Sequence, residues 1–341
     1  MKKNTRSGEK GEKQVYDRGL SVLEQYGLES TAVYRGRGAL ICQTDQGLVL
    51  IKEFCGTPKK LEYQACLLSC IGEKSQVLSD EILPNQEGAY ISADKDNISY
   101  VVKRWYEGKE CDTRSEGDIY RGITAMADLH RVMQLPVQAH YVRQPLTTEF
   151  ARHNAELRKI RKFVSAKRKK NEFELAFLDT IRRFLGHGEE ALKHLETSEY
   201  TQLYENTIAR GLVCHGEFNQ HNVLMLHEKN AGKATAVTNF DKWGFDVQMA
   251  DLYQFMRKIL EKQDWDISLG KSMIQAYEEI RPISKMEKEN LKIRFAYPEK
   301  YWKLANYYYT HNKAWISKKN LEKLNRLADQ EERWRNFVES L

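Results

Sequence analysis

The sequence predicts an α+β protein of two lobes, in which a small antiparallel β-sheet precedes a larger and mostly helical part. Two observations predict this division. Short apolar stretches separated by glycine-containing and polar turns fill residues 31–106, which is the pattern of antiparallel strands. From residue 119 onward apolar residues recur mostly at helical spacing, and only Pro282 and Pro298 interrupt the C-terminal third. We therefore predict a disordered basic tail over residues 1–13, a sheet lobe over 14–107 and a helical lobe over 108–341.

The composition is that of a soluble globular protein, with 41% hydrophobic and 30% charged residues among 341. No apolar run approaches the roughly 20 residues that a membrane span requires, and the lysine-rich start lacks the apolar core of a signal peptide. We therefore expect a protein without a membrane span, in the cytoplasm of the cell that makes it. The cysteines form no CxxC pair and no cluster with histidine, which predicts buried thiols rather than zinc or disulfides. They are Cys42, Cys55, Cys66, Cys70, Cys111 and Cys214.

The net charge of +6 is unevenly distributed, and residues 158–170 hold a second concentration of lysine and arginine after the N-terminal one. A run of this kind usually forms the solvated face of a helix, which is the interpretation we favour. The alternative is a surface for an acidic partner. Nucleic acid is not expected as a partner, because no recognition motif accompanies the charge.

The sheet lobe opens with a short helix predicted over residues 14–29. Strands at 32–34, 39–42 and 48–54 follow, joined by turns that contain glycine. Such a hairpin can bring backbone N–H groups close to phosphates. The two glycines of the first turn, taken alone, predict only a hairpin.

A single cation, Lys52, lies near the end of an otherwise apolar strand. In kinases a lysine in this place contacts the nucleotide phosphates and pairs with a glutamate on the next helix. Glu62, in the helical segment 60–68, is the candidate for that glutamate. A solvated salt bridge on the surface is the alternative.

Residues 77–106 predict further strands, at 77–78, 82–83, 89–91 and 99–106, and Gly108 ends the pattern. A helix follows over residues 119–133. The boundary between the lobes is therefore predicted within residues 105–110. His130 lies beside the apolar side of this helix, and we interpret it as a packing histidine.

The helical lobe includes an inserted pair of charged helices over residues 149–185, predicted to end at 186–188, with the insert as a whole reaching about residue 200. Their apolar residues form one narrow stripe, so we expect the rest to be exposed. Near the C-terminus Tyr297, Tyr301 and Tyr308 recur at helical spacing, and we predict that this aromatic stripe is core rather than a ligand platform.

The residues that suggest chemistry begin with an apolar pair that leads into His215-Gly216. An acid follows at Glu217, and Asn222 comes five positions later. Kinases build a catalytic loop in this way: the acid faces the acceptor hydroxyl, and the asparagine holds a metal ion.

A second strand then leads to Asn239-Phe240, where kinases place a metal-binding acid before a phenylalanine. Asp251-Leu252 opens a helix shortly afterwards. Any one of these elements is a weak signal, but all of them in this order and spacing predict a protein kinase-like fold.

These motifs resemble those of the aminoglycoside phosphotransferase and choline kinase group, and more closely those of the CotS-type spore coat proteins of endospore-forming bacteria. The resemblance extends from the strand at 48–52 through the two motifs to the helix that begins near Tyr297. It implies a small sheet lobe over a larger helical lobe, with nucleotide between them. The roles it implies are phosphate binding for Lys52, orientation of Lys52 by Glu62, the catalytic position for Glu217, metal binding for Asn222, and structural support from His215 and Asp251.

The sequence departs from this family pattern at two positions. Glu217 replaces the catalytic aspartate, and its extra methylene displaces the carboxylate by on the order of 1 Å, which can cost about 100-fold in a positioned reaction. Asn239 replaces the metal-binding aspartate, so the charge that helps to hold Mg²⁺ is lost. Asp241 can share a face with residue 239 in a strand and is therefore a candidate substitute ligand.

Three functions follow from these observations. The first, which we favour, is a structural or scaffolding spore coat protein with a degenerate catalytic site, a pseudokinase, whose partners are other coat proteins. The second is an active ATP-dependent phosphotransferase that acts on a small hydroxylated molecule or a coat protein. The third is a nucleotide-binding regulator. We expect binding of ATP and Mg²⁺ to be weak or absent, and synthesis in the cytoplasm of the mother cell before assembly onto the spore coat.

Overall fold

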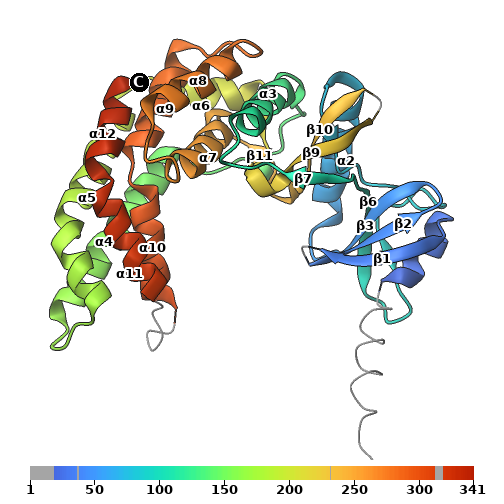
Figure 1. Ribbon diagram of the computed structural model, residues 1–341, viewed down its shortest axis with the longest axis horizontal. Coiled ribbons are helices and arrows are strands. Elements are labelled where there is room, and N and C mark those ends of the chain that lie inside the picture. The colour runs from blue at the N-terminus through green and yellow to red at the C-terminus, as the bar shows by residue number, and fades with distance from the viewer. Residues whose placement is uncertain (1–18, 37, 231, 312–317) are drawn as a thin grey trace, which may run out of the picture. The chain divides into compact units, whose positions relative to one another are not determined.

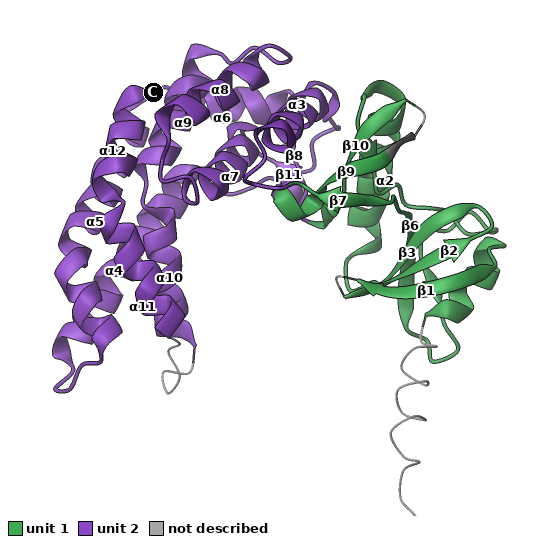
Figure 2. Cartoon of the chain, in the orientation of Figure 1, with its two compact units in different colours: residues 1–111, 220–241 green, residues 112–219, 242–341 purple. Residues whose placement is uncertain are grey.

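The computed structural model describes residues 19–36, 38–230, 232–311 and 318–341. The chain divides into two compact units, shown in different colours in Figure 2. We call residues 1–111 and 220–241 the sheet unit, and residues 112–219 and 242–341 the helical unit. The predicted basic tail, residues 1–13, lies outside the described residues.

The sheet unit contains a five-stranded antiparallel sheet in the order β1-β2-β3-β6-β5 (Figure 1). A 3-10 helix, η1 (Leu20–Tyr26), precedes it. The prediction of strands at 32–34, 39–42 and 48–54 is therefore confirmed. The strands are β1 (Ser30–Gly36), β2 (Ala39–Thr44), β3 (Gly47–Glu53), β5 (Ser92–Ala93) and β6 (Ser99–Arg104).

The central strands β3 and β6 are buried on both faces, but the two faces differ in kind. Val49, Ile51 and Val102 pack with η1 in one apolar cluster. The alternate residues of the same strands, which point the other way because successive side chains of a strand alternate, include Lys52 and Lys103. The second face therefore carries two lysines that are buried or half-buried.

Helix α2 (Pro58–Lys74) and a second sheet complete the sheet unit. Proline suits the first position of a helix because it has no N–H that would need a partner there, and Leu61, Leu68 and Ile71 give α2 a buried side. The second sheet has the order β4-β10-β9-β7. Its strands are β4 (Leu78–Ser79), β7 (Gly108–Glu110), β9 (Val223–Asn230) and β10 (Lys233–Val237).

Three local predictions in this unit need correction. The helix predicted over 14–29 is, within the described residues, only the short η1. Residues 89–91 are not a strand, because the Asn85 side chain accepts hydrogen bonds from the backbone of Glu87 and Ala89 and forms a turn there. Gly108 does not end the strand pattern; it begins β7, where a Cβ would come within 2.6 Å of the Met225 carbonyl oxygen of β9.

The helical unit holds the remaining helices and a two-stranded pair, β8 with β11. Its largest buried side chains are aromatic, and the stripe of Tyr297, Tyr301 and Tyr308 is buried as predicted. The elements are α3 (Glu116–Val132), η2 (Ala139–Tyr141), α4 (Leu146–Ala166), α5 (Glu172–Thr197), α6 (Tyr200–Ala209), β8 (Val213–Cys214), β11 (Gly244–Phe245), α7 (Met249–Leu260), α8 (Ile267–Glu278), α9 (Lys285–Ala296), α10 (Glu299–Thr310), α11 (Lys318–Asp329) and α12 (Glu331–Ser340). Two short 3-10 turns complete the chain: η3 (Gln220–Asn222) belongs to the sheet unit, and η4 (Phe240–Lys242) spans the point where the chain passes to the helical unit.

The predicted pair of charged helices corresponds to α4 and α5, but α5 does not end at residues 186–188. Helix α5 continues to Thr197. Gly188 allows close packing against α4, because its carbonyl accepts a hydrogen bond from Asn154 and a Cβ there would lie 2.6 Å from the Asn154 side chain. The glycines are therefore a contact point within a helix, not its end.

The basic run between these helices is not uniformly solvated. Arg168 and Lys169 are exposed as predicted. Lys167, however, donates to the fully buried carboxylate of Glu174, which also accepts from Tyr308 and from the backbone N–H of Asn171.

Two further predictions concern the whole chain. Cys42, Cys111 and Cys214 are buried as predicted, whereas Cys55 and Cys66 are exposed, which corrects the prediction of buried thiols for these two. In the described part of the chain, no helix combines the length and the apolar character needed to cross a membrane.

Candidate functional site

The sheet unit brings two lysines onto one face of its five-stranded sheet. In the register of β3 with β6, Leu50 lies opposite Lys103 and Lys52 lies opposite Val101. Lys52 and Lys103 are therefore diagonal neighbours, a separation at which long side chains still interact. Two like charges at that distance repel each other unless an anion lies between them.

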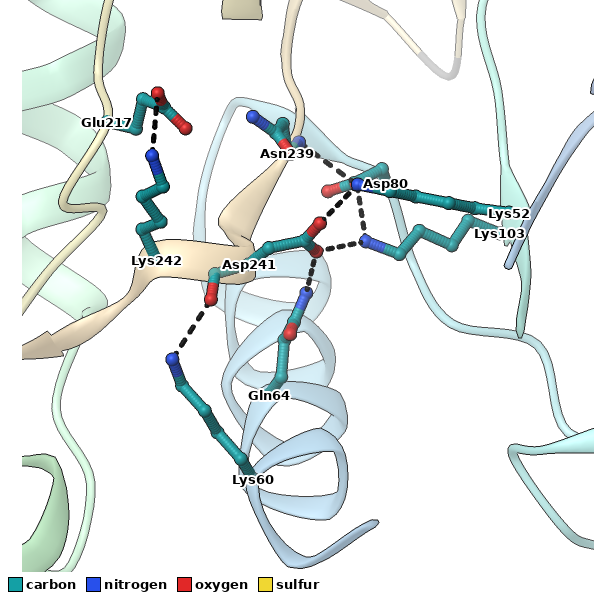
Figure 3. A network of polar contacts seen from close by, with 9 residues as sticks. All are labelled: Lys52, Lys60, Gln64, Asp80, Lys103, Glu217, Asn239, Asp241 and Lys242. Atoms are coloured by element: carbon teal, nitrogen blue, oxygen red, sulfur yellow. Dashed lines mark hydrogen bonds and ion pairs between the residues drawn. The ribbon is translucent and has the colours of Figure 1, made fainter. Parts of the chain in front are cut away.

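Asp241 supplies that anion (Figure 3). Its Oδ2 lies 2.5 Å from Lys52 Nζ, and its Oδ1 lies 3.0 Å from Lys103 Nζ. Helix α2 adds two contacts, because Gln64 donates to the same Oδ1 at 3.5 Å and Lys60 Nζ donates to the Asp241 backbone carbonyl at 3.0 Å. Both carboxylate oxygens of Asp241 thus face ammonium groups.

A second carboxylate, Asp80, completes this network. Asp80 comes directly after β4, and its Oδ2 accepts hydrogen bonds from Lys103 Nζ and from the backbone N–H of Asn239, each at 3.0 Å. The side chains of Lys103 and Asp80 are each only 3% exposed, whereas those of Lys52 and Asp241 are 36% and 37% exposed. The Lys103–Asp80 ion pair is therefore the buried half of the network.

The electrostatics of the network follow from these contacts. Burial by itself would raise the pKa of Asp241, but the charges of Lys103 and Lys52 and their hydrogen bonds outweigh burial, and its pKa lies well below the usual value. Burial would lower the pKa of Lys103, but attraction to Asp80 and Asp241 outweighs burial, and its pKa is raised. Asp241 and Lys103 are therefore both charged at neutral pH.

The predicted ion pair between Lys52 and Glu62 is wrong. Glu62 is exposed on α2, and the carboxylate that contacts Lys52 belongs to Asp241, far along the chain. Two residues after Glu62 on the same helix, Gln64 is buried and points at Asp241 instead. The residue of α2 that contacts the Asp241 carboxylate is thus an uncharged amide.

The two predicted metal-binding amides lie on neighbouring backbone of the sheet unit, because the N–H of Thr238 donates to the carbonyl of Asn222 at 2.9 Å. Asn222 is buried. Asn239 has a left-handed backbone conformation, with a φ of 67°, which asparagine adopts more readily than most residues. Its backbone N–H, which donates to Asp80, is the link between this segment and the lysine network.

The loop that contains Glu217 belongs to the helical unit, and hydrogen bonds from its backbone to Asp251 fix its position. This buried carboxylate accepts the backbone N–H groups of His215 at 2.6 Å and Gly216 at 2.9 Å, and it lies 3.2 Å from the ring Nε2 of His130. His130 in turn contacts the Tyr277 hydroxyl at 2.7 Å. In the structure His130 is therefore a buried packing residue, and burial lowers its pKa.

The Glu217 carboxylate forms an ion pair with a lysine. Its Oε1 lies 3.1 Å from the ammonium of Lys242, the residue that follows Asp241 in the chain. Its backbone N–H donates to Nδ1 of His215 at 3.2 Å, so this contact fixes the start of the turn. Gly216 has a φ of 79°, and a Cβ there would come within 2.0 Å of the Lys242 carbonyl oxygen, so only glycine fits.

A cavity of about 350 Å³ opens beside this loop within the helical unit. Charged groups of both signs line it, among them Asp246, Arg294 and Lys303, together with the ring of Trp302. Burial raises the pKa of Asp246 to about 6, because Arg294, at 3.9 Å, only partly offsets it. The mixture of charges does not select one class of ligand.

Comparison with solved structures shows which fold the chain has. An aminoglycoside phosphotransferase from Alicyclobacillus acidocaldarius is similar over 94% of both chains, with a TM-score of 0.83 at 17% sequence identity. A spectinomycin phosphotransferase, solved with ADP and spectinomycin, is similar over 96% of this chain and 98% of its own, with a TM-score of 0.63 at 12% identity. The chain therefore has the kinase-like fold of aminoglycoside phosphotransferases, and the predicted fold class is confirmed.

Sequence comparison then identifies the family. The chain belongs to the family described as "Spore coat putative kinase YutH", whose model matches residues 20–341. Spore coat protein S of Bacillus subtilis is 22% identical over 323 residues, which are 90% of this chain and 87% of that protein. The predicted resemblance to spore coat proteins of this fold is confirmed, and the chain is a kinase-like spore coat protein.

Phosphotransferases with kinase-like folds hold Mg²⁺ on the nucleotide phosphates, so the predicted ligands can be tested for their fit to a divalent cation. Asn222 and Asn239 offer neutral amides, and both oxygens of Asp241 face lysines. Mg²⁺ is bound in proteins through one or two carboxylates. Across the described residues, no group of three or more His, Cys, Asp or Glu side chains could hold a metal. These residues do not fit a resident divalent cation.

Two residues of the network, Lys103 and Asp80, were not predicted as site residues. The signal for Lys103 was partly present, because it follows the apolar run Tyr100-Val-Val102, but Arg104 directly after it makes the pair look like an ordinary charged strand end. Asp80 carried a weaker signal, as an acid directly after a short apolar strand. Neither residue could be joined to Asp241 without the register of the sheet.

Proposed function

We propose that this protein is a structural component of the spore coat that keeps the kinase-like fold and does not transfer phosphate. The main observation behind this proposal is the pairing of the Asp241 carboxylate with two lysines. Asp241 is the only carboxylate among the three predicted metal ligands, and each of its two oxygens forms an ion pair with a lysine ammonium group. A site in this state cannot position a metal-bound phosphate, which is most of what catalysis requires in phosphoryl transfer.

The predicted catalytic acid supports the same proposal. Glu217 reaches further than an aspartate would, and Lys242 pairs with it. The hydrogen bonds from the Glu217 loop to Asp251 nevertheless keep its fold. The loop therefore fits a structural role without catalysis.

The place of action that we propose is the spore coat, with other coat proteins as partners. The family model and the Bacillus relative support the coat. The exposed pair Arg168 and Lys169, at the turn between α4 and α5, is our candidate contact for an acidic surface of such a partner. Synthesis in the mother cell is part of the same proposal.

The test is metal-dependent release of labelled phosphate from ATP by four proteins: wild type, Asn239→Asp, Glu217→Asp and the double variant. We expect wild type at background. Asn239→Asp restores one charged ligand and should first strengthen binding of metal-bound nucleotide, while Glu217→Asp alone should change little. Only the double variant should show turnover.

The alternative is an active phosphotransferase in which Asp241 leaves the lysines and binds the metal. Robust wild-type turnover that vanishes in Glu217→Gln and in Asp241→Asn would establish that alternative and overturn the scaffold proposal. Turnover that survives both substitutions would indicate a contaminating kinase, and an independent preparation by a different purification route then decides the question.

A further inference from the structure

The Lys103 ammonium is the most deeply buried cation of the sheet unit's charged network. It lies 3.0 Å from Asp80 Oδ2 and 3.0 Å from Asp241 Oδ1, on a side chain that is 3% exposed. A buried charge is tolerated only when it is paired and hydrogen-bonded. Lys103 therefore depends on both carboxylates, and they in turn depend on Lys103.

The protein itself supplies the cations that face both carboxylates of this network. The ammonium groups of Lys52 and Lys103 pair with Asp80 and Asp241, and Lys60 adds a third positive charge at the Asp241 backbone carbonyl. A divalent cation entering this set would have to displace a lysine. The lysine that stands between two carboxylates, as a metal ion would, is Lys103 and not Lys52, which contacts Asp241 (Figure 3).

The geometry around Lys103 is close to what a metal ion needs. Because both acceptor oxygens lie 3.0 Å from the same Nζ, they are at most about 6 Å apart. A Mg²⁺ or Mn²⁺ ion with ligands at roughly 2.1 Å would draw them closer together by an ångström or two. The other oxygen of Asp80, Oδ1, is buried and has no hydrogen-bond donor among the described residues, so a ligand position on this carboxylate is unused.

We propose that Lys103 is a built-in replacement for a divalent cation: its ammonium holds Asp80 and Asp241 together, and its removal turns these two carboxylates into a binding site for a hard divalent metal. This site shares Asp241 with the predicted one, but its second ligand, Asp80, follows β4 and does not belong to the motifs around Asn222 and Asn239. The proposal rests on Asp241 staying with its lysines in wild type, and its test measures metal binding without any phosphate transfer.

The experiment compares the full chain with its Lys103→Met variant, in which a side chain of similar length loses the charge. Mn²⁺ is the probe, and its binding is measured by the loss of the free-ion electron paramagnetic resonance signal and by the melting temperature. We expect no specific site in wild type. Lys103→Met should melt lower than wild type without metal and should bind one Mn²⁺ at least tenfold more tightly than wild type, with its melting temperature restored toward the wild-type value.

Two control variants make the result specific. Lys52→Met removes the other lysine on Asp241 but leaves Lys103 in place, so it should gain no Mn²⁺ site. Asp80→Asn with Lys103→Met removes one charge of each sign, so it should fold without metal and should not respond to Mn²⁺.

Each outcome decides the question. If Lys103→Met folds only when Mn²⁺ is present, the proposal is supported as strongly as by a binding isotherm. If Lys103→Met remains unfolded at every Mn²⁺ concentration, if Lys52→Met binds Mn²⁺ equally well, or if the double variant does so, the proposal is overturned. Tight Mn²⁺ binding by wild type would also overturn it.

Discussion

The loop between α4 and α5 holds two nearby lysines that can be compared. One of them pairs with a buried carboxylate, and the other is exposed. Lys167 donates to Glu174, a carboxylate with no exposed surface, whereas Lys169 is exposed two residues later. Replacing either lysine by methionine removes one positive charge from the same loop. Any difference in stability between the two variants therefore reports the contact with Glu174.

The expected magnitude follows from the partners of Glu174. Removing one partner of a fully buried ion pair costs about 3–5 kcal/mol. Lys167 is 31% exposed, and Glu174 keeps Tyr308 and the Asn171 N–H as donors, so we expect about 2 kcal/mol for Lys167→Met. Surface substitutions such as Lys169→Met usually stay within about 0.5 kcal/mol.

The assay is thermal unfolding of the two variants and wild type. For a unit of roughly 200 residues, 2 kcal/mol corresponds to a fall of about 4–8 °C in Tm. Lys169→Met should stay within about 2 °C of wild type. Equal melting temperatures for all three proteins would refute the claim that Lys167 stabilises the fold through the buried Glu174.

Three further predictions address the partner surface, the Glu217 loop and the cavity. Arg168→Glu with Lys169→Glu should abolish recruitment to the coat, followed by a fluorescent fusion, without lowering Tm; normal recruitment would exclude this surface. Gly216→Ala should lower the free energy of unfolding by more than 2 kcal/mol. Gly88→Ala, at a similar φ of 83° but with open space around it, should lower it by only about 1 kcal/mol. Similar losses for the two variants in denaturant titrations would contradict the steric argument. Burial raises the pKa of Asp246 to about 6, so the folded state binds a proton at this group more tightly than the unfolded state does. The protein therefore loses up to about 3 kcal/mol of stability as pH rises from about 4 through 6. Asp246→Asn should gain stability relative to wild type between pH 4.5 and 7.5, and a stability difference that does not change with pH would contradict the assignment.

The fold could be predicted from the sequence because its signals are local. The strands β1 to β3 alternate with glycine turns, and the long helices keep apolar residues at helical spacing. The errors occurred where a side chain overrode the local pattern. Asn85 turns the chain where apolar residues suggested a strand, and Gly188 packs against Asn154 where a glycine suggested a helix end.

The candidate site was only partly predictable, because its contacts are distant in sequence. Lys52 and Asp241 were each identified, but from separate motifs and for different roles. Their pairing depends on the register that sets Lys103 opposite Leu50 and on the path that brings residue 241 to that face. The expectation that Glu62 meets Lys52 came from the family pattern, and the actual orientation of α2 presents Gln64 instead.

The measurement that tests the central claim most directly is a thermal titration of wild-type protein with ATP, with and without Mg²⁺ or Mn²⁺. A ligand that binds the folded state raises Tm by mass action. Because its own lysines neutralise Asp80 and Asp241, we expect the metal to add nothing to any shift that ATP produces. A Tm rise with ATP that appears only when the metal is present would show that a metal–nucleotide site survives, and would contradict the claim.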